Sequence, residues 1–166
     1  DENQETQDVR YNEIDGQGGV EIDSFLRKAA FALRFGQIEP LISNFLTDES
    51  RIIYVRDVRD RVEKLAPFLK FDADPYPVIL DGRLVYVVDG YTTTDRYPYA
   101  QRAPVSDLDS DSGLRDRFNY VRNSVKAVVD AFDGDVKFYV VDPDDPIIQV
   151  YQSAFSGLFS PASEMP

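Results

Sequence analysis

The residues best suited to bind a ligand lie in one short stretch, residues 89–99. Its candidate binding residues are Asp89, Tyr91, Asp95, Arg96, Tyr97 and Tyr99, and three consecutive threonines stand among them. A tyrosine ring offers flat apolar area with a hydroxyl at its edge, a combination that grips sugars and extended peptides. The stretch therefore predicts a binding loop. The alternative interpretation is that these tyrosines only pack the loop onto the fold.

A second stretch has the pattern of a cation site. Asp107, Asp109 and Asp111 alternate with leucine and serine and are followed by Gly113. Alternating acids can arrange carboxylate oxygens around calcium, and a glycine permits the turn. The twelfth position is Phe118, where a standard calcium loop has a bidentate glutamate. The three aspartates are the candidate calcium ligands, and a solvated acidic loop is the competing interpretation. No other cofactor is expected.

Any catalysis in this segment would depend on carboxylates, hydroxyls or lysine, because the chain has no His and no Cys. That composition excludes Ser-His-Asp and Cys-His sites, His/Cys zinc sites and thiol redox chemistry. Aspartates at 72, 74, 81 and 89 surround one predicted hairpin. Two carboxyl groups about 5–10 Å apart can hydrolyse a glycosidic bond. A hydrolase is therefore the alternative function, although no residue is designated catalytic.

Length and charge limit the remaining classes. The chain has 166 residues, 43% of them hydrophobic, and a formal net charge of −12. That charge would repel nucleic acid, so no nucleic-acid partner is expected. Its apolar runs are far shorter than the ~20 residues of a membrane helix, so this segment is not expected to span a bilayer. We predict a mobile acidic tail over 1–17, a single domain over 18–160 and a short tail over 161–166.

Apolar periodicity predicts the helices that would position these residues. One helix should begin after Asp23 or Ser24 and end at Gly36, with a short helix after Pro40. The apolar stripe of the first helix comprises Ile22, Phe25, Leu26, Ala29, Ala30 and Leu33. A second periodic stretch, 54–66, carries oppositely charged pairs four residues apart and should stop before the proline at 67. A third should follow Asp145 as its cap and run to about residue 156.

Two Asp-Gly pairs between apolar runs predict two β-hairpins. The first joins 78–80 to 83–88, and the second joins 125–132 to 135–141. A two-residue loop in the second hairpin would place Asp130 opposite Lys137. One face of this hairpin would then be apolar, with Val125, Ala127, Val129, Ala131, Val136, Phe138 and Val140, and the other, outward face would carry Lys126, Asp130, Lys137 and Tyr139. Helices and hairpins that do not alternate strictly indicate an α+β fold. The expected architecture is an antiparallel sheet, built from these two hairpins, that packs against the amphipathic helices.

Five longer motifs resemble one known family. They are SRIIY at 50–54, LAPFL at 65–69, DADPYP at 72–77, DGRLVYVVDGYTT at 81–93 and NYVRNSVK at 119–126. They are similar to the large multi-pass bacterial membrane proteins known as uncharacterised protein family 0182. The likeness runs from Gly19 to Met165 and departs at position 86, where Tyr86 replaces an expected tryptophan.

The resemblance implies a soluble region on the extracytoplasmic side of the cell membrane, following a bundle of membrane helices. It implies no catalytic residue, because no activity is established for the family. The expected function is a non-catalytic module that binds an envelope protein or glycan. The rest of the same membrane protein is a further expected partner. A carboxylate-dependent hydrolase, completed by residues outside this segment, remains the alternative.

Overall fold

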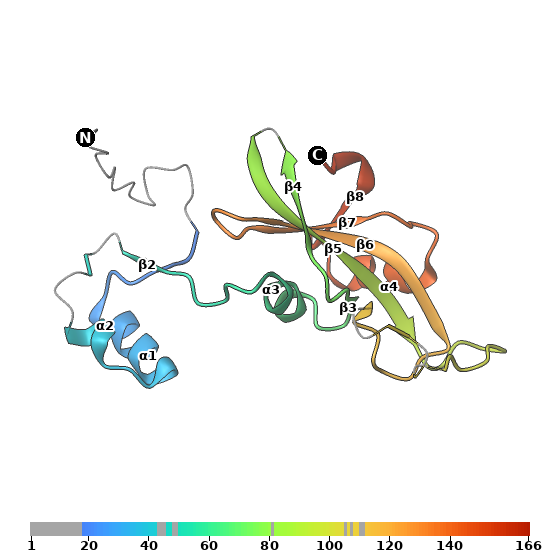
Figure 1. Cartoon of the computed structure of the whole chain (residues 1–166), viewed down its shortest axis with the longest axis horizontal. Helices are drawn as coiled ribbons and strands as arrows, with labels where there is room; N and C mark the ends of the chain where they lie inside the picture. Colours follow the sequence, from blue (N-terminus) through green and yellow to red (C-terminus); the bar gives the residue numbers. More distant parts are fainter. Residues whose placement is uncertain are drawn as a thin grey trace, which may run out of the picture. The chain divides into compact units, whose positions relative to one another are not determined.

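The computed structural model describes residues 18–42, 46–47, 50–80, 82–104, 106, 108–109 and 112–166. The chain divides into two compact units, residues 1–54 and 55–166, which are described separately (Figure 1). The predicted tail over 1–17 lies outside the described residues, as does Asp81 in the first predicted turn. The single domain over 18–160 stays a prediction.

The first unit contains two short strands and two helices. Strand β1 (Val20–Glu21) pairs antiparallel with β2 (Arg51–Ile52). Helix α1 spans Phe25–Phe35 and α2 spans Glu39–Ile42. The side chain of Ser24 caps the start of α1, and Gly36 ends it in a left-handed conformation with φ 66°. Both predicted ends of this helix are confirmed.

The apolar residues of α1 do not all pack inward. Among them Ala32 is buried, and Phe31 lies against Phe35, with ring centroids 5.8 Å apart. Leu26 and Leu33, two members of the predicted apolar stripe, are exposed instead. The helix was correctly predicted, but within the described residues much of its apolar stripe faces outward.

The second unit is built on a six-stranded sheet in which long antiparallel strands occupy the centre. The strands are β3 (Lys70–Phe71), β4 (Tyr76–Leu80), β5 (Arg83–Thr94), β6 (Tyr120–Asp130), β7 (Val136–Val140) and β8 (Phe159–Pro161). The order is β3-β5-β6-β7-β8, and β4 also pairs with β5. Only the β7–β8 pair is parallel among the described strands. Helices and a mainly antiparallel sheet give the predicted α+β class.

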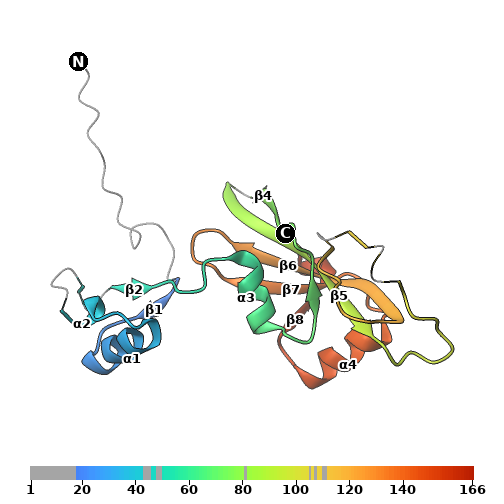
Figure 2. The same cartoon turned by 60° about the horizontal axis from the view of Figure 1, so that its bottom comes forward.

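One face of this sheet, here called the helix-covered face, packs against α3 (Val58–Leu65) and α4 (Pro146–Ala154), which Figure 2 shows beside the strands. Val62 from α3 and Ile148 from α4 are fully buried. The buried residues that the strands contribute to this core are Phe71, Val88, Val125, Ala127, Val129, Phe138 and Val140. The alternating apolar positions predicted for 125–140 therefore form the core.

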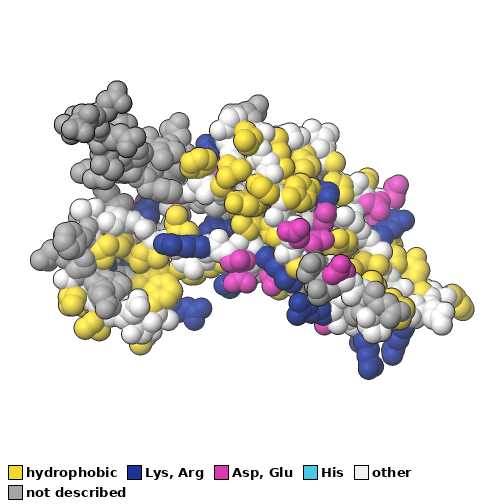
Figure 3. Space-filling view, viewed as in Figure 1, with side chains coloured by type: hydrophobic (Ala, Val, Ile, Leu, Met, Phe, Trp, Pro, Cys, Tyr) yellow, Lys and Arg dark blue, Asp and Glu magenta, His cyan; other side chains and the backbone are white. Residues whose placement is uncertain are grey.

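The opposite face of the sheet has a smaller apolar cluster beside polar residues. Val85, Val87, Val128 and Tyr139 are buried there, and Met165 packs against them. Residues 161–166 contribute the end of β8, the 3₁₀ helix η4 (Ala162–Glu164) and this contact, and the predicted boundary at 160 stays a prediction. Figure 3 shows hydrophobic side chains at the surface over the β4–β5 hairpin.

The register of the second hairpin differs from the prediction. Val129 lies opposite Val136, and Val128 lies opposite Lys137. Asp130 therefore does not face Lys137, and the prediction of that cross-strand pair was wrong. The shift is two residues, so each side chain keeps its predicted face of the sheet.

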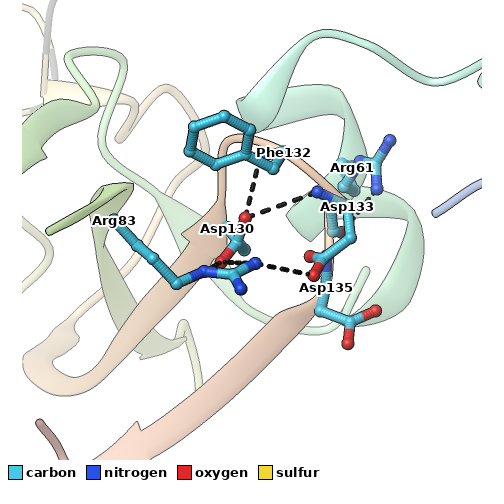
Figure 4. A network of polar contacts seen from close by, with 7 residues as sticks. Arg61, Arg83, Asp130, Phe132, Asp133 and Asp135 are labelled. Carbon is cyan, nitrogen blue, oxygen red and sulfur yellow. Dashed lines mark hydrogen bonds and ion pairs between the residues drawn. The ribbon is translucent and has the colours of Figure 1, made fainter. Parts of the chain in front are cut away.

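The cause of this shift is the side chain of Asp130, which organises a turn longer than two residues (Figure 4). Its Oδ1 accepts hydrogen bonds from the backbone N–H of Phe132 at 2.8 Å and of Asp133 at 3.4 Å. Arg83 donates to Asp130 at 2.9 Å and to Asp133 at 3.0 Å. These bonds satisfy turn amides that a two-residue loop would not contain.

Replacing Asp130 with alanine should loosen this turn. The loss of its backbone hydrogen bonds is expected to lower the free energy of unfolding by about 1–2 kcal/mol. Thermal unfolding and faster amide exchange at Phe132 would measure the effect. Asp135→Ala is the matched control, because that side chain is exposed. Equal stability of the two variants would contradict this account of the turn.

Candidate functional site

The polar ends of β5 and β6 carry the candidate site. Along both strands side chains alternate between the two faces of the sheet. A register shift follows Gly90, which lies opposite Val125, while Tyr91 lies opposite Asn123. Ser124 is thus an extra residue, a β-bulge, and bulges often redirect side chains beside functional sites.

The Asp89 cluster occupies the opposite face of the sheet at these strand ends. We define it as Asp72, Tyr76, Asp89, Tyr91, Asn123 and Lys126. Asp89 forms an ion pair with Lys126 and accepts a hydrogen bond from Asn123 at 3.1 Å. The hydroxyl of Tyr91 donates to Asp72 at 3.2 Å. The side chains of Asp89 and Lys126 are 21% and 25% exposed, so the cluster is accessible from solvent.

Local charges fix the protonation of two members of the cluster. Burial and the carboxylates of Asp72 and Asp89 raise the pKa of Tyr91 to about 12. Burial opposes the charged form of Lys126, but its hydrogen bond and ion pair with Asp89 prevail and raise its pKa. At neutral pH the cluster therefore presents a neutral phenol and an ammonium group. Neither pKa lies near neutral pH, as a general acid or base requires.

The raised pKa of Tyr91 can be measured directly. We expect its phenol to titrate near 12 and to titrate at lower pH in Asp72→Asn, which loses a hydrogen bond and a nearby charge. Because its pKa is raised on folding, Tyr91 stabilises the protein fully below pH 10, and this contribution is lost as the pH rises toward 12. Ultraviolet titration of the native chain against Tyr91→Phe would isolate it. A pKa near 10 in the native chain would contradict the geometry.

The structure separates the six predicted binding residues into three groups. Asp89 and Tyr91 belong to the Asp89 cluster. Tyr97 stacks on Tyr120 instead, with ring centroids 4.6 Å apart. Its backbone is held by Asn119, which accepts from the Tyr97 N–H at 2.9 Å and donates to its carbonyl at 2.8 Å.

The rest of the predicted loop is exposed. Asp95 and Arg96 form an exposed ion pair with an N···O distance of 3.7 Å. Tyr99 is fully exposed and has φ 59°, the only positive value for a non-glycine residue in the described part of the chain. The idea that all these tyrosines only pack the loop does not hold for Tyr99. Its binding role stays a prediction.

A second polar cluster, centred on Asp145, lies on the helix-covered face, and Tyr120 connects it to Tyr97. Asp145 is fully buried and caps α4, accepting from the N–H of Ile147 at 2.9 Å. It also accepts hydrogen bonds from three hydroxyls, those of Thr92, Ser124 and Tyr120. Burial favours the protonated acid, but these hydrogen bonds together hold the pKa of Asp145 below its usual value. Both carboxylate oxygens of Asp145 accept hydrogen bonds from within the protein, which indicates a structural role.

The carboxylates weighed for hydrolysis are partly brought together. The N–H of Asp72, the residue after β3, donates to the carbonyl of Asp89 on β5 at 2.9 Å, so the two residues lie side by side. Asp74 is exposed, and its N–H donates to Asp72 Oδ1 at 3.0 Å. Sequence reasoning did not select Lys126 and Asn123 as site residues. The hairpin prediction placed Lys126 on the outward, polar face of the sheet, and this placement was the signal that could have identified it.

The predicted calcium ligands cannot be placed together, because Asp107 and Asp111 lie outside the described residues. The carbonyl of Asp109 accepts from the hydroxyl of Ser112 at 2.7 Å. In the described part of the chain, no three acids lie close enough together to hold a metal ion. The calcium site therefore stays a prediction.

None of the described helices is long and apolar enough to cross a bilayer.

Sequence comparison identifies the family. The model of the uncharacterised protein family UPF0182 matches residues 1–166, and the chain belongs to that family. It is 46% identical over 156 residues to a UPF0182 protein of Methanospirillum hungatei, covering 94% of this chain. It is 51% identical over 151 residues to one from Geobacter sulfurreducens, covering 90% of this chain.

These relatives are much longer than this chain. The alignments span 17% of the Methanospirillum protein and 16% of the Geobacter protein. A UPF0182 protein of Clavibacter michiganensis is 44% identical over 164 residues, 95% of this chain and 17% of the relative. No solved structure matches the chain. The 166 residues thus correspond to about one sixth of the proteins that they match.

Proposed function

We propose that this region is a non-catalytic binding module and that the Asp89 cluster is its recognition surface. The observation that supports this proposal is a half-exposed set of fixed donors and acceptors on one sheet face. Lys126 and Asn123 donate beside the acceptor Asp89, and Tyr91 adds an aromatic ring. Two tyrosines among paired polar groups suit a hydroxyl-rich polymer, because sugars offer both hydroxyls and apolar ring faces.

The proposed ligand is an envelope glycan, and the proposed location is the extracytoplasmic side of the cell membrane. The family resemblance motivates the location. The net charge of −12 disfavours a polyanionic ligand and leaves neutral or cationic polymers as the better class. Within the cluster, Lys126 neutralises Asp89, so the carboxylate of Asp72 leaves a net negative charge, which also disfavours a polyanion.

Titration of the isotopically labelled region with cell-wall glycan fragments tests this proposal. We expect chemical-shift changes at Asn123 and Lys126, and at least tenfold weaker binding after Tyr91→Ala because a stacking surface is lost. Asp144→Ala, at an exposed position before α4, is the control and should bind normally. The proposal fails if no fragment binds, or if Tyr91→Ala binds as tightly as the native region.

A carboxylate-dependent hydrolase is the second candidate, and the adjacency of Asp72 and Asp89 favours it. Hydrolysis of glycans by a full-length family protein, abolished by Asp72→Asn and by Asp89→Asn, would establish this activity. The protonation of Tyr91 and Lys126 argues for binding instead, since neither exchanges a proton readily at neutral pH.

A further inference from the structure

The hydrogen bonds of Asp89 leave one of its carboxylate oxygens open. Asp89 Oδ1 accepts from Asn123, at 3.1 Å, and from Lys126, whereas Asp89 Oδ2 accepts from none of the described residues. In the described part of the chain Arg51 Nε is the only buried side-chain atom without a partner, so Asp89 Oδ2 is reached by solvent. A ligand group that meets this oxygen must therefore bring a hydrogen-bond donor.

The neighbouring carboxylate of Asp72 also has room for a donor. Its Oδ2 accepts from the hydroxyl of Tyr91 at 3.2 Å, and its Oδ1 accepts from the backbone N–H of Asp74 at 3.0 Å. Each carboxylate oxygen has two lone pairs, so each can accept one more hydrogen bond. The single O–H of Tyr91 is already used on Asp72. Asp72, Asp89 and Tyr91 together therefore offer acceptors and no further donor.

Charge and aromatic area narrow the class of donor. Two carboxylates, those of Asp72 and Asp89, share the Asp89 cluster with one ammonium group, that of Lys126. This imbalance favours a cationic donor over a neutral one. The rings of Tyr76, which is 43% exposed, and Tyr91 belong to the same cluster. The face of a tyrosine ring attracts a cation and also packs against the apolar face of a sugar.

We propose that the ligand of the Asp89 cluster is an amino sugar with a free ammonium group. This inference rests on the binding function proposed above and narrows its glycan ligand to one chemical class. The ammonium group binds Asp72 and Asp89, and the sugar ring lies on Tyr91. An N-acetylated sugar suits these residues less well, because its amide is uncharged, offers one N–H and brings a carbonyl acceptor towards the carboxylates.

Calorimetric titration of the chain with two matched sugars tests the inference. The probes are fully deacetylated chitotriose and tri-N-acetylchitotriose. We expect the deacetylated sugar to bind about tenfold more tightly or better, as one hydrogen bond to a charged group provides. Asp72→Asn keeps the side-chain volume, removes the charge and should weaken binding of the deacetylated sugar about tenfold. Asp144→Asn, which removes the same charge from an exposed position before α4, is the control and should bind normally.

The possible failures are distinguishable. Equal affinity for the two sugars, or tighter binding of the acetylated one, would overturn the inference and leave the proposed binding function intact. Binding of neither sugar would overturn both. An equal loss in Asp144→Asn would show that the net charge of −12, rather than Asp72, attracts the ligand. An acetylated lysine tripeptide carries ammonium groups without a sugar ring. If it binds as tightly as the deacetylated sugar, the assignment to a glycan is wrong.

Discussion

Replacing Asp145 with alanine is expected to lower the free energy of unfolding by roughly 3–5 kcal/mol. The variant loses the helix cap of α4, which contributes about 1 kcal/mol. It also leaves the hydroxyls of Thr92 and Ser124 buried without their acceptor, and an unsatisfied buried group costs about 1–3 kcal/mol. Urea unfolding measures the change, and Asp144→Ala, an exposed neighbour, should stay within about 0.5 kcal/mol of the native chain.

The stabilisation from Asp145 should depend on pH in one direction. Its pKa is lowered on folding from the usual 3.8, so its contribution is complete well above pH 3.8. It is lost as the pH falls below 3.8 toward the folded value, because the unfolded chain takes up the proton first. Asp145→Asn should lack this dependence. The stability difference between the native chain and Asp145→Asn is therefore expected to shrink in acid. A loss below 1 kcal/mol for Asp145→Ala, or a constant difference with Asp145→Asn, would contradict the assigned role.

Replacing Gly113 with alanine is expected to lower the free energy of unfolding about as much as Asp145→Ala, for a different reason. An added Cβ would lie 1.8 Å from the carbonyl oxygen of Phe71, a backbone atom that cannot rotate away. Gly113 also has φ 69°, in the left-handed region that favours glycine. Overpacking and backbone strain each cost about 1–3 kcal/mol, so the expected loss is about 3 kcal/mol or more.

Two other glycines provide graded controls for Gly113. Gly157 has φ 90°, but its added Cβ would meet nothing within 4 Å, so Gly157→Ala should cost only the backbone strain, about 1 kcal/mol. At Gly134 the added Cβ would approach the guanidinium of Arg61 at 1.9 Å, and a flexible side chain can move. Denaturant unfolding should rank the losses in the order 113, 134, 157. A loss at Gly113 no larger than at Gly157 would show that the loop does not press on β3.

Local signals in the sequence predicted the helices well. Helix α1 begins after Ser24 and ends at Gly36, and Asp145 caps α4. In α3, Arg59 pairs with Glu63 at 2.9 Å, as the four-residue spacing indicated. These features depend on neighbours within one turn, so the sequence contains them directly. The predicted register of the second hairpin was wrong because the side chain of Asp130 accepts hydrogen bonds from backbone amides of the turn. A rule based on the Asp-Gly pair alone does not include such side-chain bonds.

The candidate site was only partly predictable. Asp89 and Tyr91 were selected from one stretch, but their partners Asn123 and Lys126 come from β6, and Asp72 follows β3. Pairing between distant strands depends on the whole sheet, and a single extra residue in β6 decides which side chains meet. Tyr97 was grouped with Asp89 because they are close in sequence, although the loop places it over Tyr120.

The bulge at Ser124 also has a consequence for how the family can diverge. Beyond this residue, Asn123 pairs with Tyr91, whereas a regular ladder from Val125 would place Ser124 there. Deleting Ser124 would leave a regular ladder in which Asn123 still pairs with Tyr91, so residues 120–123 would keep their faces of the sheet. The loss would be the Ser124 hydroxyl that donates to Asp145. A deletion within the regular ladder of residues 125–130 would instead put the side chains between the gap and the bulge on the wrong face. We therefore expect single-residue gaps among relatives to occur at Ser124 rather than within residues 125–130.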